Sequence, residues 1–307
     1  MTAVTRHLST MGQLGALLEL LWSSRPRFWR RNIVRVVAAS DVGTVRTNNE
    51  DYFLIADLTR SVTSPAATAH GNTSSGDMMA AQPLLVVADG MGGAAGGEVA
   101  SATATAVIWS CLAQASRERW LRTSYRLRQS LLEAFRVANN QIRADAARCT
   151  DLVGMGTTAT VAVVLPNVLY VGHVGDSRAY LVRDGRIQRL TRDHSLVQYL
   201  TDTGVADEVD AARGRGHALL RALGAEADVV VDISHVRLRH GDVVVLCSDG
   251  VWSALADDEI AEAVNVRRDL RATCERLVTL ANERGGRDNA TAIVSRLEAA
   301  SWRRHSG

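Results

Sequence analysis

The chain lacks the features typical of secreted, membrane-spanning and metal-knuckle proteins. Its 307 residues contain only four cysteines, Cys111, Cys149, Cys247 and Cys274, and these lie far apart. Because no pair has the close spacing of a zinc knuckle or of a disulfide framework, we interpret them as core residues of a protein in a reducing compartment. No apolar run approaches the roughly 20 residues that a membrane span needs.

The chain also lacks a recognisable leader and a strong charge. Its N-terminal apolar segment is interrupted by Glu19 and has no small-residue cleavage site, so it does not resemble a secretory signal. A net charge of +2 gives no reason to expect nucleic acid as a partner. There is no internal repeat that would indicate a solenoid. We therefore expect a cytoplasmic protein with no nucleic-acid ligand.

The first 32 residues are expected to form an N-terminal extension. Thr10 and Gln13 make a possible capping box, and leucines at helical spacing predict an amphipathic helix over residues 10–23. The following basic and aromatic stretch allows weak docking of residues 10–31 on a membrane surface or a protein. The alternative is that this helix packs its leucines on its own domain.

From residue 33 the pattern is that of an α+β domain ending near residue 298, with a tail at 299–307. The apolar content of 47% is ordinary for a globular protein. Asp184-Gly185 joins two short strand patterns and predicts a hairpin. Strands come in antiparallel runs and helices in pairs, which favours two packed sheets covered by helices. The predicted strands are 33–39, 52–56, 84–88, 158–165, 168–174, 179–183, 187–190, 229–238, 243–247 and 291–297, and the predicted helices are 98–115, 124–148, 195–203, 257–264 and 269–284.

Two segments of this domain are predicted to be irregular. Residues 59–82 are rich in Thr, Ser, Ala and Gly and show no periodicity, so we expect a mobile surface loop. Residues 204–216 are polar and broken by glycine, and we expect a flexible flap there. Arg213 and Arg215 in this flap have either a substrate-contacting role or that of a solvated loop.

Acidic residues stand where several predicted strands begin or end. The apolar run Leu84–Ala88 leads directly into Asp89 and Gly90, and similar endings place Asp176, Asp249 and Asp288, while Glu50 and Asp51 precede a strand. Each alone is typical of an ordinary turn. Together they predict a shared edge, where the carboxylates would repel each other unless a divalent cation neutralised them. Oxygen ligands without His or Cys favour Mg²⁺ or Mn²⁺ over Zn²⁺.

Six motifs then stand in the order and spacing of one family. The chain resembles the metal-dependent protein phosphatases of type 2C, especially the bacterial enzymes that oppose Ser/Thr protein kinases, over about residues 33–298. The motifs are Asp41-Val42-Gly43 with Arg46 and Asn49-Glu50-Asp51, Asp89-Gly90-Met91-Gly92-Gly93, Gly156-Thr157-Thr158, Val174-Gly175-Asp176-Ser177-Arg178, Cys247-Ser248-Asp249-Gly250 and Asp288-Asn289-Ala290-Thr291.

The resemblance implies a four-layer α-β-β-α sandwich with two Mn²⁺ or Mg²⁺ ions at one end of the sheets. By motif position, Asp89 would bridge the ions, Asp249 and Asp288 would complete one, and Glu50 with the Gly90 carbonyl would hold the other. Asp51 would orient the attacking water. Asp176 would bind a weaker third ion or, alternatively, pair with Arg178.

The implied reaction is hydrolysis of phosphoserine and phosphothreonine by a metal-activated water, without a phosphoenzyme. Arg46 can hold the phosphoryl oxygens with two hydrogen bonds, its alternative role being an ion pair with one of the acids. Met91 stands where eukaryotic members have a histidine that protonates the leaving group. The general acid is therefore left open among a water near Asp176, His173 and His194, although a lone strand histidine such as His173 is more often a core residue.

Phosphorylated proteins, and the Ser/Thr kinases that make them, are the expected partners. A catalytically silent scaffold that binds phosphoproteins is one alternative, which the presence of Glu50, Asp89, Asp249 and Asp288 disfavours. A phosphatase for small phosphate esters or for anti-sigma antagonist proteins is another, and it would share the same metal centre.

Overall fold

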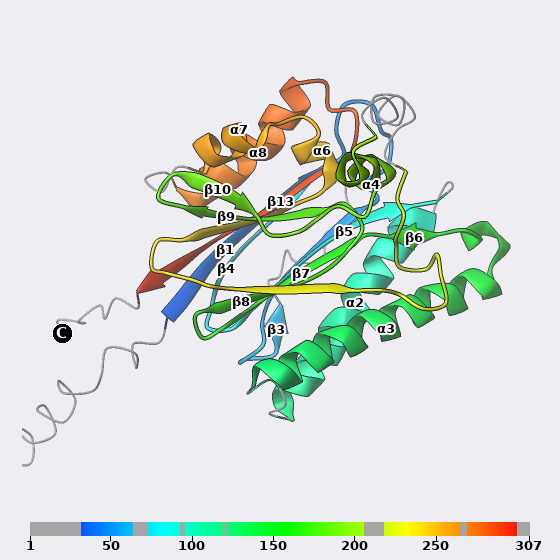
Figure 1. Ribbon diagram of the computed structural model, residues 1–307, viewed down its shortest axis with the longest axis horizontal. Helices are drawn as coiled ribbons and strands as arrows, with labels where there is room; N and C mark the ends of the chain where they lie inside the picture. Colours follow the sequence, from blue (N-terminus) through cyan, green and yellow to red (C-terminus); the bar gives the residue numbers. More distant parts are fainter. Residues whose placement is uncertain are drawn as a thin grey trace, which may run out of the picture. The chain divides into compact units, whose positions relative to one another are not determined.

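The computed structural model describes residues 32–63, 73–92, 96–118, 121, 123–205, 218–264 and 269–299. These residues form two β-sheets that face each other, with helices on both outer surfaces (Figure 1). The predicted α+β fold of two antiparallel sheets covered by helix pairs is confirmed.

Each sheet combines strands that are distant in the sequence. The six-stranded sheet runs, in spatial order, β10 (Arg186–Arg189), β9 (Arg178–Arg183), β12 (Val243–Cys247), β13 (Ala290–Ala299), β1 (Asn32–Asp41) and β4 (Thr73–Ala80). The seven-stranded sheet runs β11 (Asp232–Arg237), β8 (Val168–Val174), β7 (Ala159–Leu165), β5 (Pro83–Met91), β2 (Asp51–Asp57) and β3 (Val62–Thr63), and β6 (Gly156–Thr157) pairs with β5.

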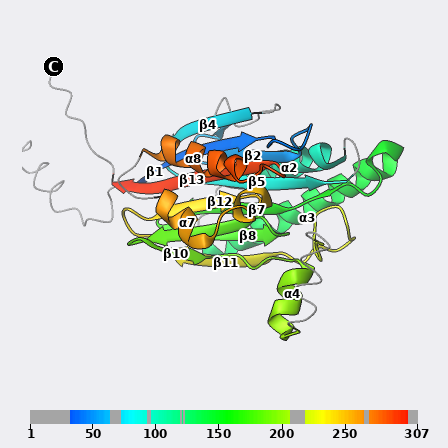
Figure 2. The same ribbon diagram turned by 90° about the horizontal axis from the view of Figure 1, so that it is seen from above.

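The helices cover the outer faces and build the rims. α2 (Gly96–Arg117) packs on β5 and against α3 (Ser124–Arg148), while α8 (Leu270–Glu283) packs on β1 and α7 (Asp257–Ala263) on β10. A 3-10 turn spans Thr150–Leu152, and α6 (Asp249–Trp252) follows β12 directly. α4 (Leu196–Thr203) projects from one edge of the sandwich (Figure 2).

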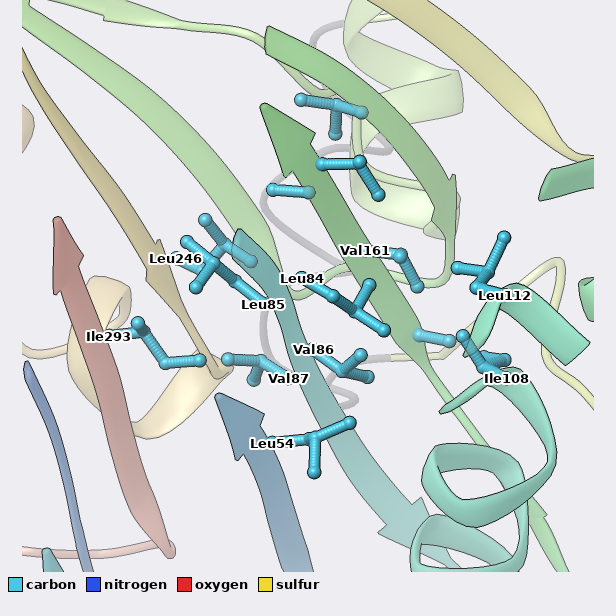
Figure 3. Close-up of a cluster of buried hydrophobic side chains, with 14 of the residues drawn as sticks. Leu54, Leu84, Leu85, Val86, Val87, Ile108, Leu112, Val161, Leu246 and Ile293 are labelled. Atoms are coloured by element: carbon cyan, nitrogen blue, oxygen red, sulfur yellow. The ribbon is translucent and has the colours of Figure 1, made fainter. Parts of the chain in front are cut away.

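The core is built by strand alternation. On β5, Leu85 and Val87 point toward Leu246 and Ile293 of the opposite sheet, and the intervening apolar residues point toward α2 (Figure 3). Successive side chains of a strand point to opposite faces, so one continuous apolar run serves two interfaces. A second core lies between the six-stranded sheet and the pair α7 and α8.

By length and composition alone α2 could cross a membrane. In the fold, its Ala100, Ala104, Ile108 and Leu112 are fully buried beneath the sheet. Packing of this face accounts for the apolar composition of the helix.

The predicted hairpin is present and has the backbone that it requires. Asp184 and Gly185 both have positive φ, 51° and 76°. Glycine adopts this region freely and aspartate tolerates it, which explains why the pair can join β9 to β10 in two residues.

The prediction of a loop over residues 59–82 is wrong in part. Residues 73–80 form β4, which pairs antiparallel with β1 from Val34↔Ala80 to Asp41↔Thr73. This strand is last in the order of its sheet and contains small polar residues, so its strand conformation depends on pairing with β1 more than on its own propensity. The predicted helix 10–23, the docking segment 10–31, most of the flap 204–216 and residues 300–307 of the tail lie outside the described residues.

Candidate active site

The acidic residues predicted to meet do lie around one cavity. It has a volume of about 470 Å³ and opens between the ends of both sheets. It is lined by Arg46, Glu50, Asp89, Gly90, Met91, Gly92, Thr158, Asp176, Leu219, Asp249 and Asp288. Seven of the eight predicted site residues are therefore on its wall. The eighth, Asp51, is 6% exposed and pairs across the strands β2 and β5 with Asp89.

Hydroxyl groups from other segments hold the side chain of Asp51 and the backbone of Asp89. The Ser248 hydroxyl donates to Asp51 Oδ2 at 2.6 Å, and the Thr291 backbone N–H in turn donates to Ser248 Oγ at 3.0 Å. Asp89 is fixed through its backbone, because its N–H donates to Thr158 Oγ1 at 2.9 Å and its carbonyl accepts from the Thr158 N–H at 2.8 Å. The carboxylate positions are thus fixed by contacts between segments far apart in the chain.

Asn289 fastens the loop that carries Arg46 and Glu50. Its Oδ1 accepts from the Glu50 N–H at 2.8 Å, and its Nδ2 donates to the carbonyls of Val42 at 2.9 Å and Asn48 at 3.0 Å. One buried amide therefore binds three backbone groups and sets the position of Glu50.

Gly90 allows the chain to approach this loop closely. Its N–H donates to the Glu50 carbonyl at 3.1 Å, and a Cβ at this position would lie 2.1 Å from the carbonyl oxygen of Gly97. Any larger residue would force the start of α2 away from the cavity. The Gly90 requirement is thus steric, in addition to any use of its carbonyl as a ligand.

Arg46 contacts an acid in this structure. Its Nη2 donates to Asp288 Oδ2 at 2.8 Å, while the side chain remains 51% exposed. This hydrogen bond and the charge of Asp288 raise the pKa of Arg46. The structure shows the ion pair that was the alternative role, and the phosphate-binding role stays a prediction.

Burial and mutual repulsion raise the pKa values of three acidic side chains in the site. Burial, together with the charge of Asp249, raises the pKa of Asp176 to about 8. Burial raises the pKa of Asp51 to about 8 against the opposing hydrogen bond from Ser248. The pKa of Asp89 is raised well above its usual value by burial and by the charges of Asp249, Asp51, Asp176 and Asp288. Such a cluster gains stability from a cation among its members.

The donor set fits a hard divalent cation. Asp51 Oδ1 and Asp176 Oδ2 are buried and accept no hydrogen bond from the described residues, and every acidic group on the wall offers oxygen. Oxygen donors of this kind suit Mg²⁺ and Mn²⁺. Within the described part of the chain, however, no three His, Cys, Asp or Glu side chains already form a complete ion cage. Asp288 accepts one hydrogen bond at each oxygen, from Arg46 and from the Asn289 N–H, which leaves a lone pair on each oxygen for an ion.

Neither candidate histidine lines this cavity. His173 is 1% exposed, its Nδ1 lies 2.9 Å from Thr160 Oγ1, and its Nε2 lies 3.1 Å from the Arg192 carbonyl. Burial lowers the pKa of His173 to about 3, so it stays neutral. His194 Nδ1 accepts from the Gly175 N–H at 3.1 Å and its Nε2 contacts Asp232. The idea that His173 is the general acid is therefore wrong. His194 stabilises the turn before Asp176 by accepting the hydrogen bond from Gly175.

The alternative in which Asp176 pairs with Arg178 is also wrong. Arg178 binds Asp193 through Nε and Nη2 and lies 3.7 Å above the Trp252 ring. Asp176 is left facing the cavity.

Three residues that hold the site together were not assigned a role in the sequence analysis. Ser248, Thr158 and Asn289 stand inside the recognised motifs, so their positions were visible. Their partners were not, because the bonds to Asp51, Asp89 and Glu50 join residues 197, 69 and 239 positions apart.

Known protein phosphatases resemble this chain in sequence. The sequence profile of the family "Protein phosphatase 2C" matches residues 67–293. The chain is 36% identical over 214 residues to the Serine/threonine phosphatase stp of Listeria monocytogenes. The aligned region covers 69% of this chain and 84% of that protein. It is 34% identical over 265 residues to the Serine/threonine protein phosphatase PstP of Mycobacterium tuberculosis, covering 86% of this chain and 45% of PstP.

Solved structures show the same architecture. The serine/threonine phosphatase of S. agalactiae superposes with a TM-score of 0.73 at 28% identity, covering 86% of this chain and all of that one. The catalytic domain of PstP in complex with two manganese ions superposes with a TM-score of 0.68 at 34% identity, covering 87% and 99%. On its sequence and its fold, this chain belongs to the protein phosphatase 2C family, in the bacterial branch of the metal-dependent protein phosphatases.

Proposed function

We propose that this chain is a metal-dependent phosphatase of phosphoserine and phosphothreonine in proteins. The observation that carries the proposal is the convergence of five acidic side chains and one arginine on a single cavity. The relatives that match over most of this chain are named Ser/Thr phosphatases, and one of them binds manganese.

The bound ions would supply a nucleophilic water near neutral pH and would offset the charge of the phosphoryl group. Asp89, Asp249 and Asp288 are the residues proposed to hold one ion, and Asp89, Glu50 and the Gly90 carbonyl the other, with Asp176 at a third, weaker position. We propose two Mn²⁺ or Mg²⁺ ions, the choice in the cell depending on which of them is available.

The protein's own groups position the reactants. Arg46 is half-exposed at the mouth of the cavity, so its guanidinium can turn from Asp288 to the phosphoryl oxygens and bind two of them. Asp51 Oδ1, buried and without a donor among the described residues, accepts a hydrogen from the attacking water and so orients it. Asp176 lines the cavity, and its Oδ2 accepts no hydrogen bond from the described residues, so we assign to it the water that protonates the leaving serine or threonine oxygen, since Met91 has no proton to give.

The proposed substrates are proteins phosphorylated by Ser/Thr kinases, and the proposed compartment is the cytoplasm. The surroundings of the cavity support a protein substrate, because the wall extends into a larger open groove that a small phosphate ester would leave empty.

The proposal is tested by turnover of p-nitrophenyl phosphate and of a phosphothreonine peptide with Mn²⁺, Mg²⁺ or EDTA. We expect turnover with either ion, none with EDTA, and at least a roughly hundredfold loss in Asp249→Asn, which weakens one ion site. Asp184→Asn, an exposed change in the hairpin, is the matched control and should keep full activity. Turnover that survives both chelation and Asp249→Asn would refute the proposal.

A further inference from the structure

A second and larger cavity lies beside the catalytic one. It has a volume of about 810 Å³ and shares Asp249 and Asp288 with the catalytic cavity. Its remaining walls come from α4, from α6 and from the loop between α8 and β13. A volume of this size is typical of sites that take up a ligand. Anything bound at Asp249 and Asp288 can therefore continue into this groove without leaving the protein surface.

Among the described residues, three arginines line this groove, and two of them are already neutralised. Arg178 binds Asp193, which is itself 5% exposed, and stacks on Trp252. Arg284 pairs with Glu259 and donates to the Ala254 carbonyl at 2.9 Å. These arginines build rigid walls and have little capacity for a further anion.

Arg287 differs from both. It is exposed on the groove, and no hydrogen bond or ion pair joins it to any of the described residues. Its backbone is nevertheless held in place on both sides. The Gly286 carbonyl accepts from the Thr44 N–H at 2.8 Å, and Asn289, two residues after Arg287, makes three hydrogen bonds to the backbone of the loop that carries Glu50. The Arg287 guanidinium is thus a free cation on a fixed support, one residue from a proposed metal ligand.

We propose that this groove binds the polypeptide that flanks the phosphorylated residue, and that Arg287 selects substrates with an acidic residue there. The inference rests on the proposed function and adds the specificity of the same site. An extended peptide advances about 3.3–3.6 Å per residue, so a side chain only a few positions from the phosphoresidue reaches the neighbouring groove. A guanidinium that lacks an ion pair among the described residues can bind a carboxylate with two parallel hydrogen bonds.

The test compares phosphothreonine peptides that differ in a single Glu or Lys, placed either before or after the phosphothreonine. The quantity measured is the ratio of kcat/KM for the Glu peptide to that for the Lys peptide, with Mn²⁺ present. We expect the wild type to prefer Glu in at least one position by roughly three- to tenfold, and Arg287→Glu to remove or reverse this preference. A general loss of activity through the neighbouring Asp288 cancels in the ratio.

Arg128→Glu is the matched control. Arg128 is exposed on α3, on the opposite outer face of the sandwich, and makes no interaction with the described residues. The Arg128→Glu substitution changes the net charge by the same amount as Arg287→Glu, and this variant should keep the wild-type ratio of kcat/KM for the Glu and Lys peptides. Raising the salt concentration from about 50 to about 500 mM should shrink the wild-type preference, because the contact is solvent-exposed.

The outcomes separate the two proposals. A wild type that turns over the peptides with the same Glu to Lys ratio as Arg287→Glu overturns this inference and leaves the proposed function intact. A wild type that turns over no peptide overturns both.

Discussion

At the scale of single residues, the loop that carries Glu50 depends on Asn289. We predict that Asn289→Ala lowers the free energy of unfolding by about 2–4 kcal/mol, because three backbone groups in partly buried hydrogen bonds lose their partner. Turnover should fall as well, since Glu50 loses its fixed position. Urea denaturation measures the first effect and peptide turnover the second.

The control for this change is Asn140→Ala. Asn140 is exposed on α3, and its loss should alter stability by at most about 0.5 kcal/mol. Equal stability of the two variants would contradict the role given to Asn289.

His173 provides a second prediction at this scale. Its lowered pKa means that its neutral form is the stable one in the folded protein, so its contribution is present above the unfolded value near 6.5 and is lost as the pH falls toward 3. NMR of labelled histidine should therefore show no titration of His173 between about pH 5 and pH 8. Titration near pH 6.5 would restore it as a candidate proton donor.

At the scale of elements, α3 is held to the sandwich chiefly by its apolar face. Phe135 is fully buried, and a Cβ on Gly172 of β8 would lie 2.8 Å from its ring, so the glycine provides the space that the ring occupies. The sequence predicted both the helix and this face, because the residues recur at helical spacing. It did not predict the contact with Gly172, which depends on how the helix lies across the sheet.

We expect Phe135→Ala to cost about 3–5 kcal/mol of unfolding free energy, the usual loss for a large aromatic ring in a packed core. Leu132→Ala on the same helix is the control, since Leu132 is an exposed residue and should matter little. Thermal or urea unfolding of the two variants, measured side by side, decides whether this face holds α3 in place.

The strand β4 was predicted to be part of a loop because its sequence has little strand character. Thr73–Ala80 has neither regular alternation nor branched apolar residues, and Gly76 stands where the Ile55 side chain packs, 2.9 Å from the site of a Cβ. Pairing of all of β4 with β1, from Val34 to Asp41, outweighs this weak local preference. A segment whose conformation is imposed by its neighbour leaves no pattern of its own to detect.

At the scale of the whole molecule, the acidic cluster links stability to pH and to metal. Asp51 and Asp176 have pKa values raised to about 8 in the fold, above the ordinary value of 3.8. A carboxyl group whose pKa is higher in the folded state than in the unfolded state stabilises the fold while it is protonated. The metal-free protein should therefore lose stability as the pH rises from about 4 through 8. A bound cation replaces the protons, and its stabilising effect should therefore increase over the same range.

We predict that Mn²⁺ raises the melting temperature of the protein more at pH 8 than at pH 5.5. Asp176→Asn should make the metal-free protein less sensitive to pH, because one buried acid no longer ionises, while Asp184→Asn should leave the pH profile unchanged. Differential scanning fluorimetry with Mn²⁺ or EDTA gives both comparisons. A Mn²⁺ effect that is larger at pH 5.5 would contradict the account.

Most of the strands and helices, and the positions of the acids at strand ends, could be predicted from the sequence alone, with β4 as an exception. Such features follow from local periodicity and from glycine, and both can be read along a single segment. Three features could be known only from the folded protein: Arg46 contacts Asp288, Asn289 binds the Glu50 loop, and Arg287 lies on a groove beside the catalytic cavity without an ion pair among the described residues. These depend on which segments, distant in the chain, become neighbours once the two sheets pack, and no local pattern encodes that choice.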